Sequence, residues 1–128
     1  MSVKNSLSIL VVDDTSVSRG LIIMSLEEIG FKRISFAKDG GSAFDLAVRE
    51  GVHLVISDQN MPGMSGLELL GKLRQTRSTQ KVGFILVSGK LDQSLIDDAR
   101  RYGANNVLEK PFDTKKMRAC LKPLVGVV

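Results

Sequence analysis

The 128-residue sequence has few of the residues from which disulfides, zinc sites and aromatic ligand pockets are built. Its single cysteine cannot form a disulfide within the chain, and its single histidine cannot complete a zinc site with that cysteine. There is no tryptophan and only one tyrosine, so few rings are present to stack on a planar ligand. The composition therefore favours a site made of charged and small polar side chains.

Long hydrophobic runs are also missing. No unbroken stretch of apolar side chains exceeds four residues, as in Ile9–Val12, whereas a helix that crosses a bilayer needs about 20. Asp13 and Asp14 interrupt the first apolar segment before it reaches the length of a secretory signal. We therefore expect a cytoplasmic protein without a transmembrane span or a membrane partner.

The remaining composition is that of an ordinary globular domain, with 43% apolar and 25% charged residues. The length predicts a single domain over residues 1–128. The net charge of +4 combines a balance of −2 over residues 1–58 with +6 over residues 59–128. Because no nucleic-acid recognition motif accompanies the basic half, we interpret it as solvated helix faces and a patch for an acidic protein partner.

Short runs rich in Val, Ile and Phe alternate with longer segments of helical spacing. Several of the short runs are apolar almost throughout, as in parallel strands that are covered on both faces. The longer segments carry apolar residues three or four positions apart and end at Gly30, Gly51 and Gly103, which predicts helices. The predicted strands are Leu7–Val12, Arg33–Ala37, His53–Ser57, Val82–Ser88 and Asn106–Glu109.

Five strand–helix units imply an α/β fold, a doubly wound parallel sheet with helices on both faces. Arg77–Gln80 is expected to be a loose polar loop. The apolar face of the first helix is expected to contain Val17, Leu21, Met24 and Ile29, with Ile22 and Leu26 beside them. That of the fourth helix is expected to contain Leu91, Leu95, Ala99 and Tyr102.

Polar residues stand at the ends of four predicted strands: Asp13 and Asp14 after the first, Asp58 after the third, Ser88 at the end of the fourth and Lys110 after the fifth. Ligands of open α/β sheets bind outside the carboxyl ends of the strands, so we expect these residues to converge. Clustered carboxylates repel one another. Lys110 and a bound Mg²⁺, which prefers oxygen ligands, are expected to offset that charge.

Capping of helices and loops is a simpler explanation for the acidic residues. Asp13 and Asp14 could cap the first helix, and Asp58 could cap a loop, but capping does not account for all three carboxylates with a lysine opposite. Nucleotide-binding motifs are absent, because no G-x-G-x-x-G follows the first strand. Gly83–Lys90 has five residues between its glycines instead of four, and Leu91 stands where a P-loop requires Ser or Thr.

These residues, together with the run 58–66 and Lys110-Pro111-Phe112, resemble the receiver domain of bacterial two-component response regulators. The similarity is especially close to the chemotaxis regulators of that family, and it covers essentially the whole chain. The resemblance implies a flavodoxin-like (βα)5 fold with strand order 2-1-3-4-5. It also implies a protein that promotes its own phosphorylation and dephosphorylation and is not an enzyme acting on a separate substrate.

The resemblance further assigns roles to single residues. Asp58 would be the phosphoacceptor, a carboxylate nucleophile that takes a phosphoryl group from a histidine kinase. Mg²⁺ would be held by Asp14, by Asp58 and by the backbone carbonyl of Asn60, with Asp13 holding it through water.

Two further residues complete the implied site. Ser88 and Lys110 would bind oxygens of the phosphoryl group. Pro111 would follow a cis peptide bond and so fix the direction of Lys110.

The chain ends with its fifth predicted helix, so we expect output by contact with a protein target such as a flagellar motor switch protein. The alternative within the family is a phosphate sink that drains a shared kinase. Val107, three residues before Lys110, stands where similar chemotaxis regulators have an aromatic residue that turns inward, and weak coupling without that ring would suit a sink. An alternative of another class is a flavodoxin-like small-molecule binding module, which would need a phosphate-binding loop and stacking rings.

Two residues with reactive side chains are predicted to be structural. Cys120 lies on the apolar face of the last helix, where we expect it to be buried filler. His53 opens a strand at the end of the sheet opposite the acidic residues, so we expect no catalytic role for it.

Overall fold

The computed structural model describes residues 3–126. Its strands are all parallel and form one sheet in the order β2-β1-β3-β4-β5. The predicted flavodoxin-like (βα)5 fold with order 2-1-3-4-5 is therefore confirmed. The strands are β1 (Ser8–Val12), β2 (Arg33–Ala37), β3 (Leu54–Asp58), β4 (Gly83–Ser88) and β5 (Asn106–Glu109).

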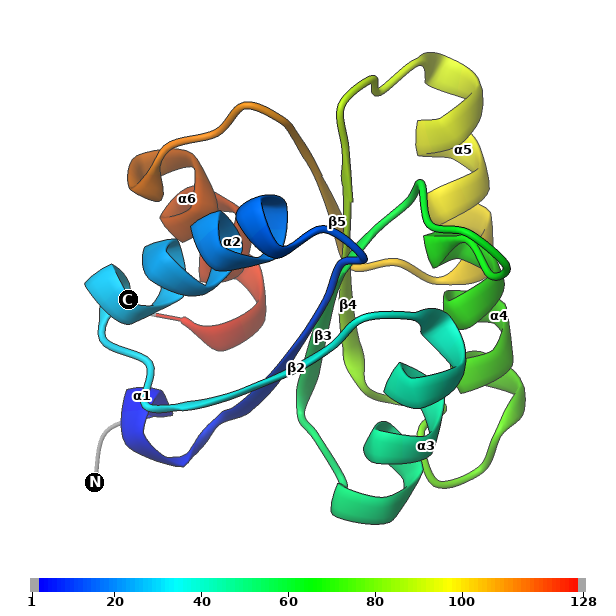
Figure 1. Ribbon diagram of the computed structural model, residues 1–128, viewed down its shortest axis with the longest axis horizontal. Helices are drawn as coiled ribbons and strands as arrows, with labels where there is room; N and C mark the ends of the chain where they lie inside the picture. Colours follow the sequence, from blue (N-terminus) through cyan, green and yellow to red (C-terminus); the bar gives the residue numbers. More distant parts are fainter. Residues whose placement is uncertain (1–2, 127–128) are drawn as a thin grey trace.

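Helices cover both faces of this sheet (Figure 1). α2 and α6 lie on one face, and α3, α4 and α5 lie on the other. A single helical turn, α1 (Val3–Ser6), precedes β1 and was not predicted. The other helices are α2 (Ser16–Ile29), α3 (Gly40–Glu50), α4 (Gly66–Gln75), α5 (Gln93–Tyr102) and α6 (Thr114–Val125). Within residues 3–126, no helix has the length and apolar character that a membrane span requires.

The sheet is buried on both faces because its strand side chains alternate between two hydrophobic clusters. Ile9, Val11 and Val87 belong to the cluster under α2 and α6. Leu10, Val12 and Leu86 belong to the cluster under α3, α4 and α5. This two-sided burial explains why the central strands β1, β3 and β4 are largely apolar on both faces.

Local sequence signals fix where most helices begin and end. Ser65 and Glu68 form a reciprocal capping box at the start of α4. Aspartate side chains accept backbone N–H bonds at the starts of three other helices, α3, α5 and α6. Gly30, Gly51 and Gly103 end their helices at positive φ, as predicted.

The predicted apolar face of α2 is wrong in part. Val17, Leu21 and Met24 are 77%, 56% and 52% exposed, and the buried stripe of α2 contains Ile22, Ser25, Leu26 and Ile29. The error arose because α2 has more apolar residues than one core-facing stripe requires. The periodicity therefore fitted two overlapping faces.

Two smaller predictions are also wrong, the first only in part. Leu91 lies before α5, which begins at Gln93, and Tyr102 is 44% exposed at its end, but Ala99 is buried and Leu95 packs against the same cluster, as predicted. The segment 77–80 is an ordered turn, since Thr79 is buried and its hydroxyl donates to the backbone oxygen of Leu73 at 2.8 Å. The polar composition of this segment does not reveal that one of its side chains hydrogen-bonds to the end of the preceding helix.

Gly66, the first residue of α4, packs against the end of β3. A Cβ atom at Gly66 would lie 2.6 Å from the backbone oxygen of Asp58 and 2.6 Å from Leu86 Cδ1. The absence of a side chain therefore allows α4 to start beside Asp58.

We expect Gly66→Ala to lower the free energy of unfolding by about 1–3 kcal/mol, because the backbone oxygen cannot move aside without displacing β3. Urea unfolding followed by circular dichroism measures the change. Gly20→Ala is the matched control, since a Cβ there meets nothing within 4 Å. That control is expected to raise the free energy of unfolding by about 0.5–1 kcal/mol, and equal effects of the two substitutions would contradict the argument.

Candidate active site

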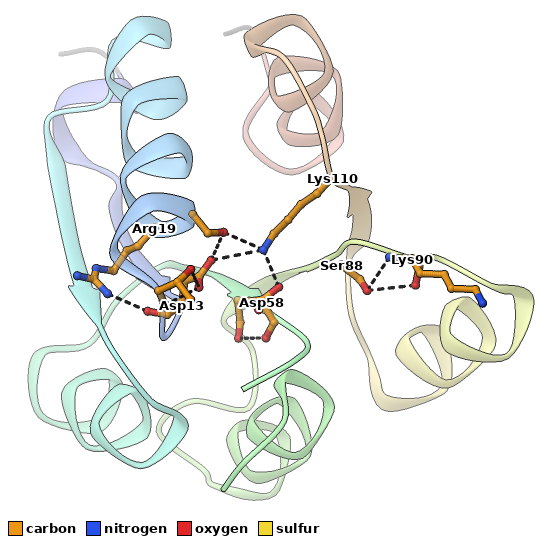
Figure 2. Close-up of polar contacts among 9 residues, drawn as sticks. Asp13, Arg19, Asp58, Ser88, Lys90 and Lys110 are labelled. Carbon is orange, nitrogen blue, oxygen red and sulfur yellow. Dashed lines mark hydrogen bonds and ion pairs between the residues drawn. The ribbon is translucent and has the colours of Figure 1, made fainter. Parts of the chain in front are cut away.

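The predicted site residues meet at one edge of the sheet (Figure 2). Asp13 directly follows β1, Asp58 and Ser88 are the last residues of β3 and β4, and Lys110 directly follows β5. Because the strands are parallel, all four carboxyl ends lie at the same edge. The convergence predicted from the sequence is therefore observed.

Three carboxylates form a cluster at this edge. Oxygens of Asp13, Asp14 and Asp58 all lie within 4.8 Å of one another. The side chains of Asp13 and Asp58 are only 1% and 8% exposed, whereas Asp14 is exposed. Carboxylates this close repel one another strongly in a poorly solvated place, so the arrangement requires nearby positive charge.

Lys110 supplies that charge. Its Nζ lies 3.0 Å from Asp58 Oδ1 and 3.6 Å from Asp13 Oδ2. It also donates a hydrogen bond of 2.8 Å to the hydroxyl of Ser18. The peptide bond between Lys110 and Pro111 is cis, as the resemblance implied.

The start of α2 surrounds Asp13 with donors. Asp13 Oδ1 accepts from the backbone N and the hydroxyl of Thr15, at 3.1 and 3.2 Å, and Oδ2 accepts a hydrogen bond from Ser18. Arg19 donates to the backbone oxygen of Asp13 at 3.0 Å while its guanidinium lies over the ring of Phe36. Thr15, and neither aspartate, is the N-cap of α2, so the capping explanation of Asp13 and Asp14 is wrong.

Burial raises the pKa of Asp58 above its ordinary value. The hydrogen bond and charge of Lys110 act in the opposite direction, while the charges of Asp13 and Asp14 raise the pKa further. The ionised carboxylate is thus held in an unfavourable environment that Lys110 relieves in part. Added positive charge from a cation would favour the ionised form.

Ser88 and Asn60 lie at their predicted positions in the chain, but Ser88 is buried and Asn60 is exposed. The Ser88 hydroxyl is buried and bonds the backbone of Lys90, donating to its oxygen at 3.1 Å and accepting from its N at 3.3 Å (Figure 2). Asn60 is exposed in the loop between β3 and α4, two residues beyond Asp58. In this structure, therefore, the Ser88 hydroxyl is bonded to its own loop.

Sequence reasoning missed Thr15, Ser18 and Arg19. All three directly contact Asp13. The available signal was their position, since residues in the first turn of a helix that follows a strand lie close to the strand end. Their residue types alone gave no indication, because serine and threonine are common at helix starts.

The two residues predicted to be structural have the expected environments. Cys120 is buried, and burial raises the pKa of its thiol to about 11. His53 lies at the other end of the sheet, where its Nδ1 accepts a hydrogen bond of 2.9 Å from the backbone N of Ser8.

A groove of about 680 Å³ adjoins the site between α2 and the segment 110–114. Its walls include the exposed apolar side chains Val17, Leu21 and Met24, and it shares Ser18 and Lys110 with the site. An apolar surface therefore continues directly from the charged cluster.

Comparisons with known proteins agree on one family. Residues 9–122 match the family model of the response regulator receiver domain. The probable chemotaxis protein CheY of Rhizobium etli is 39% identical over 128 residues, which cover 100% of this chain and 99% of that protein. The chemotaxis protein CheY4 structure of Vibrio cholerae has a TM-score of 0.85 at 24% identity and covers 92% of this chain and 98% of its own.

A second solved structure extends the comparison of folds. It is the receiver domain of the sensor histidine kinase PA1611 from Pseudomonas aeruginosa, described with a magnesium ion coordinated in its active site cleft. Its TM-score is 0.84 at 24% identity, and it covers 94% of this chain and 98% of its own.

We expect Asp58→Asn to unfold with a higher free energy than the wild type at pH 7 in buffer containing EDTA. A raised pKa means that the folded state binds the Asp58 proton more tightly than the unfolded state. Stability therefore falls as pH rises through the raised value, and the difference between the proteins disappears below the ordinary pKa of 3.8. Urea unfolding at pH 7 and pH 3.5 measures both effects.

Asp45→Asn is the control for this experiment, since Asp45 is exposed on α3. It is expected to change the free energy of unfolding by less than about 0.5 kcal/mol at either pH. A less stable Asp58→Asn at pH 7 would show that the ion pair with Lys110 outweighs burial.

Proposed function

Because the chain belongs to the response regulator receiver domain family, we propose that it accepts a phosphoryl group on Asp58 from a phosphohistidine of a histidine kinase. In this reaction a carboxylate oxygen of Asp58 bonds to phosphorus as the phosphorus–nitrogen bond breaks, and the histidine ring leaves. The observation that supports the proposal is the buried Asp58 carboxylate, 3.0 Å from Lys110 Nζ and clustered with two other carboxylates.

The donor set at the site fits a magnesium ion. Carboxylate oxygens from three residues within 4.8 Å of one another are hard ligands of the kind that Mg²⁺ prefers. We propose that Asp14, Asp58 and the backbone carbonyl of Asn60 hold the ion, with Asp13 acting through water. When bound, the ion supplies positive charge against the phosphoryl oxygens.

Lys110 and Ser88 take complementary roles in this proposal. Lys110 pairs with one phosphoryl oxygen while it stays beside Asp58. Ser88 donates its hydroxyl to another, which requires it to leave its hydrogen bonds to the Lys90 backbone. Since those bonds belong to the loop before α5, phosphorylation would pull this loop inward and repack the surface of α5, β5 and α6.

The output of the switch is proposed to be a protein–protein contact in chemotaxis, in the cytoplasm, with a target such as a flagellar motor switch protein. The 39% identity to a probable chemotaxis protein supports this pathway. A phosphate sink for a shared kinase is the second candidate. Val107, which is half-buried in the cluster under α3, α4 and α5, has no ring to couple loop and surface and so favours the sink.

We expect acetyl phosphate to add one phosphoryl group to the full chain in the presence of Mg²⁺, as measured by intact-protein mass spectrometry. EDTA is expected to abolish the addition, and Asp58→Asn is expected to remove it because the nucleophile is gone. Asp45→Asn is the matched control and should be labelled like the wild type. Magnesium-dependent labelling of Asp58→Asn at the normal rate would contradict the choice of Asp58.

We further propose that the histidine kinase docks over the groove beside the site. A phosphohistidine must approach within bonding distance of Asp58, so the donor protein has to cover the adjoining surface. That surface is the apolar groove, which includes Leu21 and shares Lys110 with the site. We propose the kinase as the partner at this groove because the groove is continuous with the site.

Leu21→Glu tests this docking surface. We expect phosphotransfer from a histidine kinase that labels the wild type to slow at least about tenfold, because a charge enters an apolar contact. Labelling by acetyl phosphate, which needs no docking, is expected to stay within about twofold. Val48→Glu on α3, which is 44% exposed on the other face of the sheet, is the control. Wild-type transfer rates to Leu21→Glu would exclude the groove as the docking surface.

A further inference from the structure

Ser18, in the first turn of α2, lies between two charged groups of the site. Its hydroxyl donates a hydrogen bond to Asp13 Oδ2 and accepts one from Lys110 Nζ at 2.8 Å. The direct separation of Lys110 Nζ from Asp13 Oδ2 is longer, at 3.6 Å. The hydroxyl therefore links the ammonium to Asp13.

This hydroxyl does not serve the helix. Its two hydrogen bonds go to side chains of the site and neither goes to the backbone of α2. Thr15, three residues earlier, is the N-cap of the helix. A capping role therefore does not explain Ser18.

Ser18 affects how Lys110 divides its contacts between two carboxylates. An ammonium has three hydrogens on a flexible four-carbon stem, and both Asp13 and Asp58 attract it. Thr15 satisfies Asp13 Oδ1 and Ser18 satisfies Oδ2. With its oxygens satisfied, Asp13 competes less for Lys110, and the short ionic contact of 3.0 Å forms with Asp58.

We propose that Ser18 is a positioning residue that holds the Lys110 ammonium against Asp58, where it binds the phosphoryl group. This inference rests on the proposed function, phosphoryl acceptance at Asp58. Without the hydroxyl, Lys110 shifts toward Asp13 Oδ2 and pairs less well with a phosphoryl group on Asp58. Ser18 bonds neither Asp14 nor Asp58, the two carboxylates proposed to bind the metal directly, so these two stay in place.

The test measures two affinities of the full chain by calorimetry, first for Mg²⁺ alone and then for beryllofluoride at saturating Mg²⁺. Beryllofluoride mimics the phosphoryl group on the carboxylate. We expect Ser18→Ala to weaken beryllofluoride binding about tenfold, the effect of losing one hydrogen bond to a charged group. Affinity for Mg²⁺ is expected to change less than about threefold.

Two further variants separate positioning from structure. Ser18→Thr keeps the hydroxyl and is expected to bind beryllofluoride within about threefold of the wild type. Ser16→Ala makes the same substitution at an exposed position in the same helical turn and should match the wild type. Alanine is a better helix former than serine, so both alanine variants are expected to fold, which thermal unfolding checks.

The outcomes distinguish the inference from the function on which it rests. A wild type that does not bind beryllofluoride with Mg²⁺ overturns both. A wild type that binds, with Ser18→Ala binding equally well, overturns the role of Ser18 alone. Equal losses of Mg²⁺ and beryllofluoride affinity in Ser18→Ala, or a Ser18→Thr variant as weak as Ser18→Ala, overturn it as well.

Discussion

The ion pair between Lys110 and Asp58 is the interaction on which the rest of the site depends. β5, which precedes Lys110, is separated from β3 by β4, so the loop after β5 and the long lysine stem together bring the ammonium across the strand ends to Asp58. The ammonium ends 3.0 Å from Asp58 and makes a cluster of three carboxylates tolerable in a largely buried place.

This cluster stores electrostatic repulsion that binding can release. Burial and two neighbouring carboxylates raise the pKa of Asp58, and one lysine only partly compensates. A divalent cation would offset the negative charge of the three carboxylates, and the Lys110 ammonium would pair with a phosphoryl group on Asp58. The donors from the start of α2 keep Asp13 fixed while this happens, because Thr15 and Ser18 bond its two oxygens.

Two neighbouring surfaces adjoin the site. The groove along α2 begins at Lys110 and contains the exposed side chains of Leu21 and Met24. On the other side, the Ser88 hydroxyl is bonded to the Lys90 backbone in the loop before α5. The proposed docking groove and the loop proposed to switch thus adjoin the same four strand ends from opposite sides, so under this proposal one change of charge at Asp58 would affect both.

The sequence by itself determined the α/β fold class, since short continuous apolar runs, helical spacings and terminal glycines are local signals that tertiary contacts reinforced. It also determined which residues meet, because parallel strands place Asp13, Asp58, Ser88 and Lys110 at one edge whatever the packing. The tertiary structure decided the rest. The rotation of α2 against the sheet decides which of its two apolar faces is buried. The same rotation lets Ser18 bridge Asp13 and Lys110, which is 92 residues away from Ser18 in the sequence. No local pattern encodes that rotation, because it results from packing the whole core at once.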